Sequence, residues 1–349
     1  MDFECQLLFF VHLFLDSTGY KVRYIPIFFT FDNNYVVPAA VAFHSLLDKA
    51  KDGIFYNMYV LHSDITDENI ALLESVVLPF KKATLSFVNV GNFSANLWNE
   101  KTFFAGEATN NIKQFTSDTI LRCFASRFFP QYDKIIYSDV DVVFMDDISE
   151  LDEIDISNSY IGAVKNFLMK YWPGELDHLS KEHYDKLKDS YFAGGIWILN
   201  LKKIREDSLE DRMIEVINDD TIIKKWNDQD IMNISCNNKV TYISLRYISY
   251  PYLPDYLKDK NFISHYTKEE LLESIYAPKI LHFAAFKPWN AYPRGWTIWM
   301  KIFSKLGLPK TKIFKDMPFY YRLAYSIWKR LDKILRRKGI VYDAFDFFS

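Results

Sequence analysis

The chain has 349 residues, of which 49% are hydrophobic and 17% aromatic, so a disordered protein is excluded and one large α/β domain with an appendage is expected. Its formal net charge of −3 argues against a general nucleic-acid-binding protein. Cys5, Cys123 and Cys236 are widely separated, so they predict neither a disulfide framework nor a zinc site and favour a reducing compartment.

Residues 1–23 form an N-terminal extension to which we assign no function. Within it, residues 7–15 are apolar apart from His12, but this run is too short to span a bilayer. The run follows Asp2 and Glu4 rather than Lys or Arg, and no small-residue cleavage site is present, so a signal peptide is not predicted. We interpret the run as a buried extra helix.

Residues 24–295 alternate short apolar runs with helical patterns and are predicted to form one domain. Thr66, followed by two acids, is typical of a helix N-cap, and this helix should run to about Val77. A second helix is expected over residues 117–128. Strands are expected at residues 25–31, 56–61, 84–90, 134–137, 160–164, 191–199, 240–244 and 279–283. Strands separated by helices predict a largely parallel sheet covered on both faces, with ligands beyond the carboxyl ends of its strands.

The strand at residues 134–137 leads into Asp139-Val140-Asp141. Because residues two apart on an extended chain point the same way, both carboxylates can reach one hard cation. Such a pair suits Mg²⁺ or Mn²⁺ that also holds substrate phosphates. Asp32 follows the first strand, so it is expected near the same site. Alone, Asp-x-Asp is a weak signal, because such pairs often cap a helix or face solvent.

Six short motifs occur in order between about Ile25 and Trp289. They are Phe-Asp-Asn-Asn-Tyr at 31–35, Thr-Ile-Leu-Arg at 119–122, Tyr-Ser-Asp-Val-Asp at 137–141, Tyr-Phe-Ala-Gly-Gly at 191–195 followed by Leu-Asn-Leu-Lys-Lys at 199–203, Asn-Asp-Gln-Asp at 227–230, and His-Phe-Ala-Ala-Phe-Lys-Pro-Trp at 282–289. In these motifs the chain resembles glycosyltransferase family eight, which contains bacterial lipopolysaccharide galactosyl- and glucosyltransferases and glycogenin. The resemblance implies an α/β fold with a single Rossmann-like nucleotide-sugar-binding domain of GT-A type, built on a mostly parallel mixed sheet.

The resemblance also implies a donor site for UDP-glucose or UDP-galactose. Asp139, Asp141 and His282 would bind Mn²⁺ or Mg²⁺, and the imidazole favours Mn²⁺ because nitrogen ligands suit the softer ion. The other donor-binding residues implied are Asp32, Asn34 and Tyr35 for uridine, Arg122 and Asp139 for the ribose or sugar, Val140 between the two metal ligands, and Lys287 for the departing diphosphate.

The catalytic residues implied by the resemblance are Asp228, Gln229 and Lys287. A metal acting as a Lewis acid, together with Lys287, addresses the charge that develops on the leaving diphosphate. The family retains anomeric configuration, and the usual retaining scheme needs a nucleophile near the anomeric carbon. Gln229 is a poor nucleophile, so we favour front-face attack by the acceptor through a short-lived oxocarbenium ion. Gln229 would then stabilise charge while Asp228 positions the sugar.

Several of these residues have a plain structural alternative. His282, between two apolar residues, could be a satisfied core histidine, and Arg122 could be an ordinary surface arginine. Asp228 and Asp230 could be first-turn acids of a helix capped by Asn227.

Two departures from the family pattern keep other functions open. The family usually has Asn at the position of Ala193, and it usually has Gly in the loop that here reads Ala284-Ala285-Phe286, one residue short of the common His-to-Lys spacing. These departures allow a catalytically weak sugar-nucleotide-binding or scaffolding protein at a membrane. A glycogenin-like self-glucosylating enzyme is a third hypothesis, because any of 23 tyrosines could be its acceptor.

Residues 296–349 are predicted to form a C-terminal basic amphipathic helical region. Between Lys301 and Ile340, twelve Lys or Arg stand against two Asp, a net charge of +10 that leaves −13 for the rest of the chain. Over residues 318–338, apolar residues recur every four positions with basic residues opposite, which is typical of a helix that binds an anionic membrane surface. An ordinary helix packed on the main domain is the alternative. With a glycolipid acceptor, we expect a cytoplasmic protein peripheral to the inner membrane.

Overall fold

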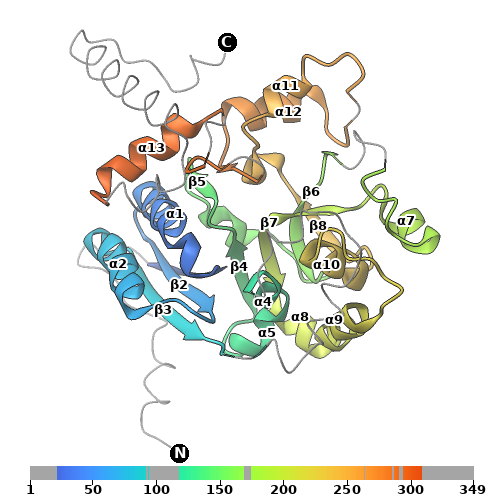
Figure 1. Ribbon diagram of the computed structural model, residues 1–349, viewed down its shortest axis with the longest axis horizontal. Helices are drawn as coiled ribbons and strands as arrows, with labels where there is room; N and C mark the ends of the chain where they lie inside the picture. Colours follow the sequence, from blue (N-terminus) through green and yellow to red (C-terminus); the bar gives the residue numbers. More distant parts are fainter. Residues whose placement is uncertain are drawn as a thin grey trace, which may run out of the picture.

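The computed structural model describes residues 22–91, 93, 118–168, 174–262, 264–284, 287–290 and 294–308. A seven-stranded sheet with strand order β3-β2-β1-β4-β7-β6-β8 forms its centre, and a two-stranded sheet joins β5 to β9 (Figure 1). The strands are β1 (Arg23–Thr30), β2 (Ile54–His62), β3 (Ala83–Asn89), β4 (Lys134–Ser138), β5 (Val142–Phe144), β6 (Ile161–Lys165), β7 (Phe192–Asn200), β8 (Val240–Ile243) and β9 (Ile280–His282).

Helices cover both faces of the large sheet (Figure 1). The α-helices are α1 (Val36–Lys49), α2 (Asp67–Val77), α4 (Asp118–Leu121), α5 (Ala125–Phe128), α7 (Lys181–Leu187), α8 (Leu201–Glu206), α9 (Leu209–Asn218), α10 (Asp228–Cys236), α11 (Leu253–Tyr256), α12 (Lys268–Tyr276) and α13 (Trp296–Lys305). Short 3-10 helices are η2 (Asn33–Tyr35), η3 (Leu78–Phe80), η6 (Arg122–Phe124), η7 (Ser149–Glu153) and η8 (Leu245–Ile248).

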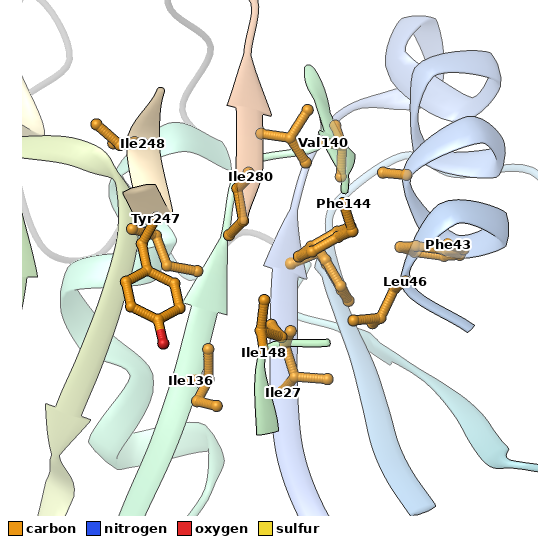
Figure 2. Packing of buried hydrophobic residues seen from close by; sticks show 14 of the residues in the cluster. Ile27, Phe43, Leu46, Ile136, Val140, Phe144, Ile148, Tyr247, Ile248 and Ile280 are labelled. Carbon is orange, nitrogen blue, oxygen red and sulfur yellow. The ribbon is translucent and has the colours of Figure 1, made fainter. Parts of the chain in front are cut away.

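The two largest core clusters follow the alternation of side chains along the strands. On β1, Ile27 and Phe29 belong to the cluster that includes α1 and α2, whereas Phe28 belongs to the cluster that includes α9 and α10. Figure 2 shows Phe43 and Leu46 of α1 in the first cluster with side chains of β1, β4 and β5. Full burial of each large apolar side chain contributes about 1.5–3 kcal/mol, so the sheet is held from both sides.

The sequence predicted all of these strands except the short β5, and the other differences concern strand direction and helix continuity. Each expected strand is present with its ends shifted by at most two residues, and the side chain of Thr66 caps α2 by accepting from Asn69 N. Strand β7 runs antiparallel to both β4 and β6, so the sheet is mixed although most of its pairings are parallel. The helix predicted over residues 117–128 is helical from Asp118 to Phe128, but a 3-10 turn interrupts it, so that α4, η6 and α5 follow one another there.

Some of the predictions for the two ends of the chain concern residues that the structure does not describe. Residues 1–21 and 309–349 are not described, and the predicted amphipathic helix at 318–338 belongs to the second of these ranges. The last described helix, α13, packs against α1 and buries Trp299, Met300 and Phe303. Across the described part of the chain, every helix is too short or too polar to traverse a bilayer.

Candidate functional site

The candidate site lies at the carboxyl ends of β1 and β4, beside the small β5–β9 sheet. Asp139 and Asp141 follow β4 on either side of Val140, and the backbone N–H of Asp139 donates to Gly195 O of β7 across 3.0 Å. Strand β5 begins directly after Asp141, and its first residue, Val142, pairs with His282 at the end of β9. This antiparallel pairing brings His282 to the two carboxylates.

Asp139, Asp141 and His282 form a cluster that could hold a metal ion. Each offers one ligand atom, and these atoms lie within 4.8 Å of one another. His282 Nε2 is 3.1 Å from Asp141 Oδ1 and 3.5 Å from Asp139 Oδ2. Ligand atoms on opposite sides of one ion are about 4 Å apart when each bond is about 2.1 Å, so the donor set fits Mg²⁺ or Mn²⁺. That these residues bind a metal stays a prediction.

Lys287 is held against this cluster. Its Nζ forms an ion pair with Asp141 Oδ2 and donates to Phe283 O at 3.0 Å and Ala284 O at 3.1 Å. Burial alone would raise the pKa of Asp141, but Lys287 and His282 hold the pKa below its usual range. Asp141 is therefore an anion before any metal binds, and Lys287 supplies its counter-charge.

Arg122 joins this cluster to α10. Its Nη1 donates to Asp139 Oδ1 at 2.7 Å, to Tyr137 Oη at 2.9 Å and to Gly194 O at 2.9 Å. Its Nη2 forms an ion pair with Asp228, and its guanidinium carbon lies 4.8 Å from the centre of the Trp197 ring. Arg122 is only 4% exposed, so the surface-arginine alternative is wrong. Arg122 is instead fixed between the buried carboxylate of Asp228 and the partly exposed carboxylate of Asp139.

Asp228 lies in an environment that disfavours its charged form. It is 1% exposed, and burial raises its pKa to about 7, with Arg122 acting in the opposite direction and Asp139 adding to the rise. A carboxyl group with a pKa this close to neutrality, paired with an arginine beside a metal-ligand cluster, is typical of functional sites.

Two glycines of β7 leave room for the side chains of Gln229 and His282 to pack against the strand. A Cβ atom at Gly194 would lie 2.9 Å from Gln229 Cγ, and one at Gly195 would lie 2.6 Å from both Cε1 and Nδ1 of His282. Both positions therefore need glycine so that the two side chains can approach the strand. The neighbouring Ala193 is 2% exposed and packs in the core cluster on the α1 side.

The residues expected to hold uridine lie after β1. Asp32 caps η2 by accepting from Asn34 N at 2.9 Å, whereas the Asn34 side chain is exposed. The Tyr35 ring meets Trp289 edge-on, with centroids 5.8 Å apart. Burial raises the pKa of Tyr35, Lys287 opposes the rise, and Asp141, Asp32 and Asp139 add to it, so its hydroxyl lies in the field of the predicted metal ligands.

The remaining predicted residues take different positions. His282 is 5% exposed, as a core histidine would be, but its Nε2 faces two carboxylates rather than a single structural partner. The Val140 side chain is 4% exposed and packs in the core, so only its backbone could contact a donor. Asn227 precedes α10 but makes no capping hydrogen bond through its side chain.

Sequence reasoning missed the aromatic residues that support Arg122. Tyr137 and Trp197 are register partners on β4 and β7, and both rings lie within 5.0 Å of the Arg122 guanidinium carbon. Tyr137 also donates its hydroxyl hydrogen bond to Asp139 Oδ1. The signal for this pairing is the β4–β7 register, which no local pattern contains. Asn233, which ties α10 to β7, was missed for the same reason.

Comparisons with known sequences show which family the chain matches. The family model described as Glycosyl transferase family 8 matches residues 26–292. The chain is 27% identical over 259 residues to a Haemophilus influenzae protein provisionally named as a glycosyltransferase, covering 69% of this chain and 70% of that protein. It is 25% identical over 205 residues to lipopolysaccharide 1,2-glucosyltransferase of Escherichia coli K12, covering 58% of this chain and 57% of that enzyme.

Comparisons with solved structures show the same fold. The galactosyltransferase LgtC, in complex with donor and acceptor sugar analogs, has a TM-score of 0.64 at 20% identity and covers 85% of this chain and 99% of its own. The apo structure of the bifunctional enzyme WbbM has a TM-score of 0.67 at 22% identity over 84% of this chain. The chain spans 51% of WbbM, so the likeness concerns about half of that enzyme. The predicted α/β fold of GT-A type is confirmed.

Proposed function

Because this chain belongs to glycosyltransferase family 8, we propose that it is a retaining enzyme that moves glucose or galactose from a UDP-sugar to a saccharide acceptor. The acceptor we propose is lipopolysaccharide or another glycolipid, in keeping with the named activity of the Escherichia coli relative. The observation that carries the proposal is the convergence of Asp139, Asp141 and His282 at the end of β4.

We assign Asp139, Asp141 and His282 as the residues that would hold Mn²⁺ or Mg²⁺. When bound, this ion supplies Lewis-acid stabilisation of the departing diphosphate. Lys287 then provides a second positive charge for the same group, because its Nζ already lies against Asp141. The positions of Asp32, Asn34 and Tyr35, after the adjacent strand β1, support a uridine site near Lys287.

We assign Arg122, Asp228 and Gln229 to the hexose. Arg122 is held by two carboxylates and Gly194 O, so its guanidinium is oriented before the donor arrives. Gln229 lies against Gly194, and its neutral amide supports front-face attack by the acceptor through an oxocarbenium-like state rather than a covalent intermediate. The acceptor hydroxyl would then approach from the same face as the departing diphosphate.

The direct test is release of UDP from UDP-glucose and UDP-galactose, with and without Mn²⁺. We expect Mn²⁺-dependent release from at least one of them, and we expect Asp141→Asn to lower the rate by at least about 100-fold. The control is Asp155→Asn, because Asp155 accepts from Ser157 N in an exposed turn away from the site. Normal turnover by Asp141→Asn would refute the metal assignment, and no release by the wild type would favour a sugar-nucleotide-binding or scaffolding protein.

The intact mass of the protein after incubation with UDP-glucose separates the self-glucosylating alternative from the proposed transferase. We expect no gain of a hexose unit, because the proposed acceptor is a separate saccharide. From the sequence of residues 318–338, we also propose a peripheral position on the cytoplasmic face of an anionic membrane.

A further inference from the structure

Asp228 and Gln229 enter α10 through a turn that normally requires glycine. Gln229 N donates to Trp226 O across 3.1 Å, so residues 226–229 close a four-residue turn. The second residue of the turn, Asn227, has φ 47° and ψ −118°. These angles are close to those of the first central position of a type II′ turn, which glycine dominates. With a Cβ atom and no side-chain capping bond, Asn227 holds this conformation under strain.

The buried carboxylate of Asp230 binds the first residue of this turn. Its Oδ2 accepts from Trp226 N at 2.7 Å, and its Oδ1 accepts from Tyr191 Oη at 2.8 Å. His178 Nε2 lies 3.0 Å from the same Oδ2. Asp230 is fully buried, so three groups from separate segments converge on one carboxylate that cannot exchange them for water.

The other side of Gln229 is attached to the sheet. Asn233 Nδ2 donates to Gln229 O at 2.8 Å and to Phe192 O at 3.1 Å, and Phe192 N donates to Asn233 Oδ1 at 2.9 Å. These bonds fix the first turn of α10 on β7. The backbone of the Asp228-Gln229 segment can therefore change its conformation mainly through the turn at Asn227.

The site tolerates little movement of this segment. Gln229 Cγ would lie only 2.9 Å from a Cβ atom at Gly194, and Asp228 is paired with the buried Arg122. A relaxed Asn227 would rotate the peptide that leads into Asp228 and move both side chains together. Misplacement of about 1 Å can lower a catalytic rate about 100-fold.

We propose that Asp230 is a positioning residue: its carboxylate, held by Tyr191 and His178, imposes the glycine-like turn at Asn227 and thereby places Asp228 and Gln229. The proposal rests on the hexose-transfer function proposed above. It assigns Asp230 no contact with substrate, because the carboxylate is buried and its acceptor positions are directed at protein groups.

The first test is Asp230→Asn. Tyr191 and Trp226 N donate to different oxygens of Asp230, and asparagine replaces one of these oxygens with an NH2 donor, so at the same position one of the two donors loses its acceptor. We expect kcat to fall about 10- to 100-fold, while the Kd for UDP with Mn²⁺ stays within about twofold, because the residues proposed for uridine and diphosphate lie elsewhere. If this variant does not fold, Tyr191→Phe removes one donor only and should lower kcat in the same direction by a smaller factor.

The deciding test is rescue by Asn227→Gly. Glycine adopts the observed angles without strain, so this change alone should raise the melting temperature. In the Asp230→Asn background it should restore most of the lost kcat, which a loss of general stability would not predict. The matched control is Asp211→Asn, because Asp211 is the exposed third residue of α9 and follows Ser208, which also has a positive φ of 50°.

An unchanged kcat in Asp230→Asn would overturn the proposal. So would a double variant whose kcat is no higher than that expected when the separate effects of Asn227→Gly and Asp230→Asn on kcat are multiplied. Melting temperatures of the two single variants and the double variant measure the same coupling without substrate. If the wild type transfers no hexose, the proposed function fails, while the melting temperatures still decide whether Asp230 controls the turn.

Discussion

Among single residues, Arg122 has the widest influence on the site. It contacts the metal-ligand candidate Asp139, whose side chain is partly exposed, on one side and the buried Asp228 on the other. Removal of one partner from a buried ion pair typically costs about 3–5 kcal/mol, because it leaves a buried charge uncompensated. Replacement of Asp228 by Asn is milder, since Arg122 keeps Asp139 and Gly194 O.

The protonation of Asp228 predicts a pH dependence of stability. In the folded protein, burial raises its pKa to about 7 from a usual value of 3.8, so the folded state keeps a proton that the unfolded chain loses between these values. The free energy of unfolding of the wild type should therefore fall, relative to that of Asp228→Asn, as the pH rises from about 4 to about 7. Above about pH 7 the difference should stay constant.

Urea unfolding of both proteins from about pH 4 to about pH 8, with a chelator present, measures this difference. Asp139→Asn is a useful comparison, because it also removes a carboxylate that contacts Arg122. A difference between wild type and Asp228→Asn that does not change with pH would contradict the raised pKa.

Part of the site could be predicted from local sequence and part could not. The alternation of side chains at a strand end placed Asp139 and Asp141 together, and the structure brings them within reach of one ion. His282 came only from the family resemblance, because its approach depends on a pairing between β5 and β9. The support from Tyr137 and Trp197 was missed, because it depends on the direction of β7.

At the scale of elements, strands were more predictable than their pairing. Apolar runs mark buried strands regardless of partner, which is why β1 and β4 were predicted within one or two residues. Strand direction depends on how the chain returns to the sheet, so the antiparallel β7 was not visible in its own residues. The interruption of the predicted helix at η6 coincides with Arg122, whose side-chain contacts are tertiary.

The close packing of β7 against the site predicts the effect of Gly195→Ala. The added methyl would lie 2.6 Å from the His282 ring and 2.7 Å from Ile248 Cδ1. The ring must then move, so we expect loss of the Mn²⁺-dependent rise in melting temperature with UDP while the fold persists.

The matched control is Gly162→Ala on β6. Its added methyl would approach Ile156 and Ile198 at 3.2 Å, in the core away from His282. This variant should be less stable, yet it should keep the response to Mn²⁺ and UDP. An equal loss of that response in both variants would show that general destabilisation, and not the His282 position, is responsible.

At the scale of the whole molecule, charge is distributed unevenly. The segment from Lys301 to Ile340 carries +10, against −13 for the rest of the chain. We predict that the protein sediments with liposomes containing anionic lipid and is released at about 1 M salt, where charge interactions are screened within about 3 Å. Neutral liposomes are the control. Failure to bind anionic liposomes at low salt would exclude the proposed membrane contact.

The pairing of β5 with β9 has a consequence for biosynthesis. Asp141 and His282 are 141 positions apart in the chain, and most of the large sheet is encoded between or before them. During translation at about 5–20 residues per second, the two aspartates leave the ribosome many seconds before the histidine. The nascent chain can therefore build its sheet well before Asp141 meets His282, and the proposed metal-binding site can be completed only after His282 has been synthesised.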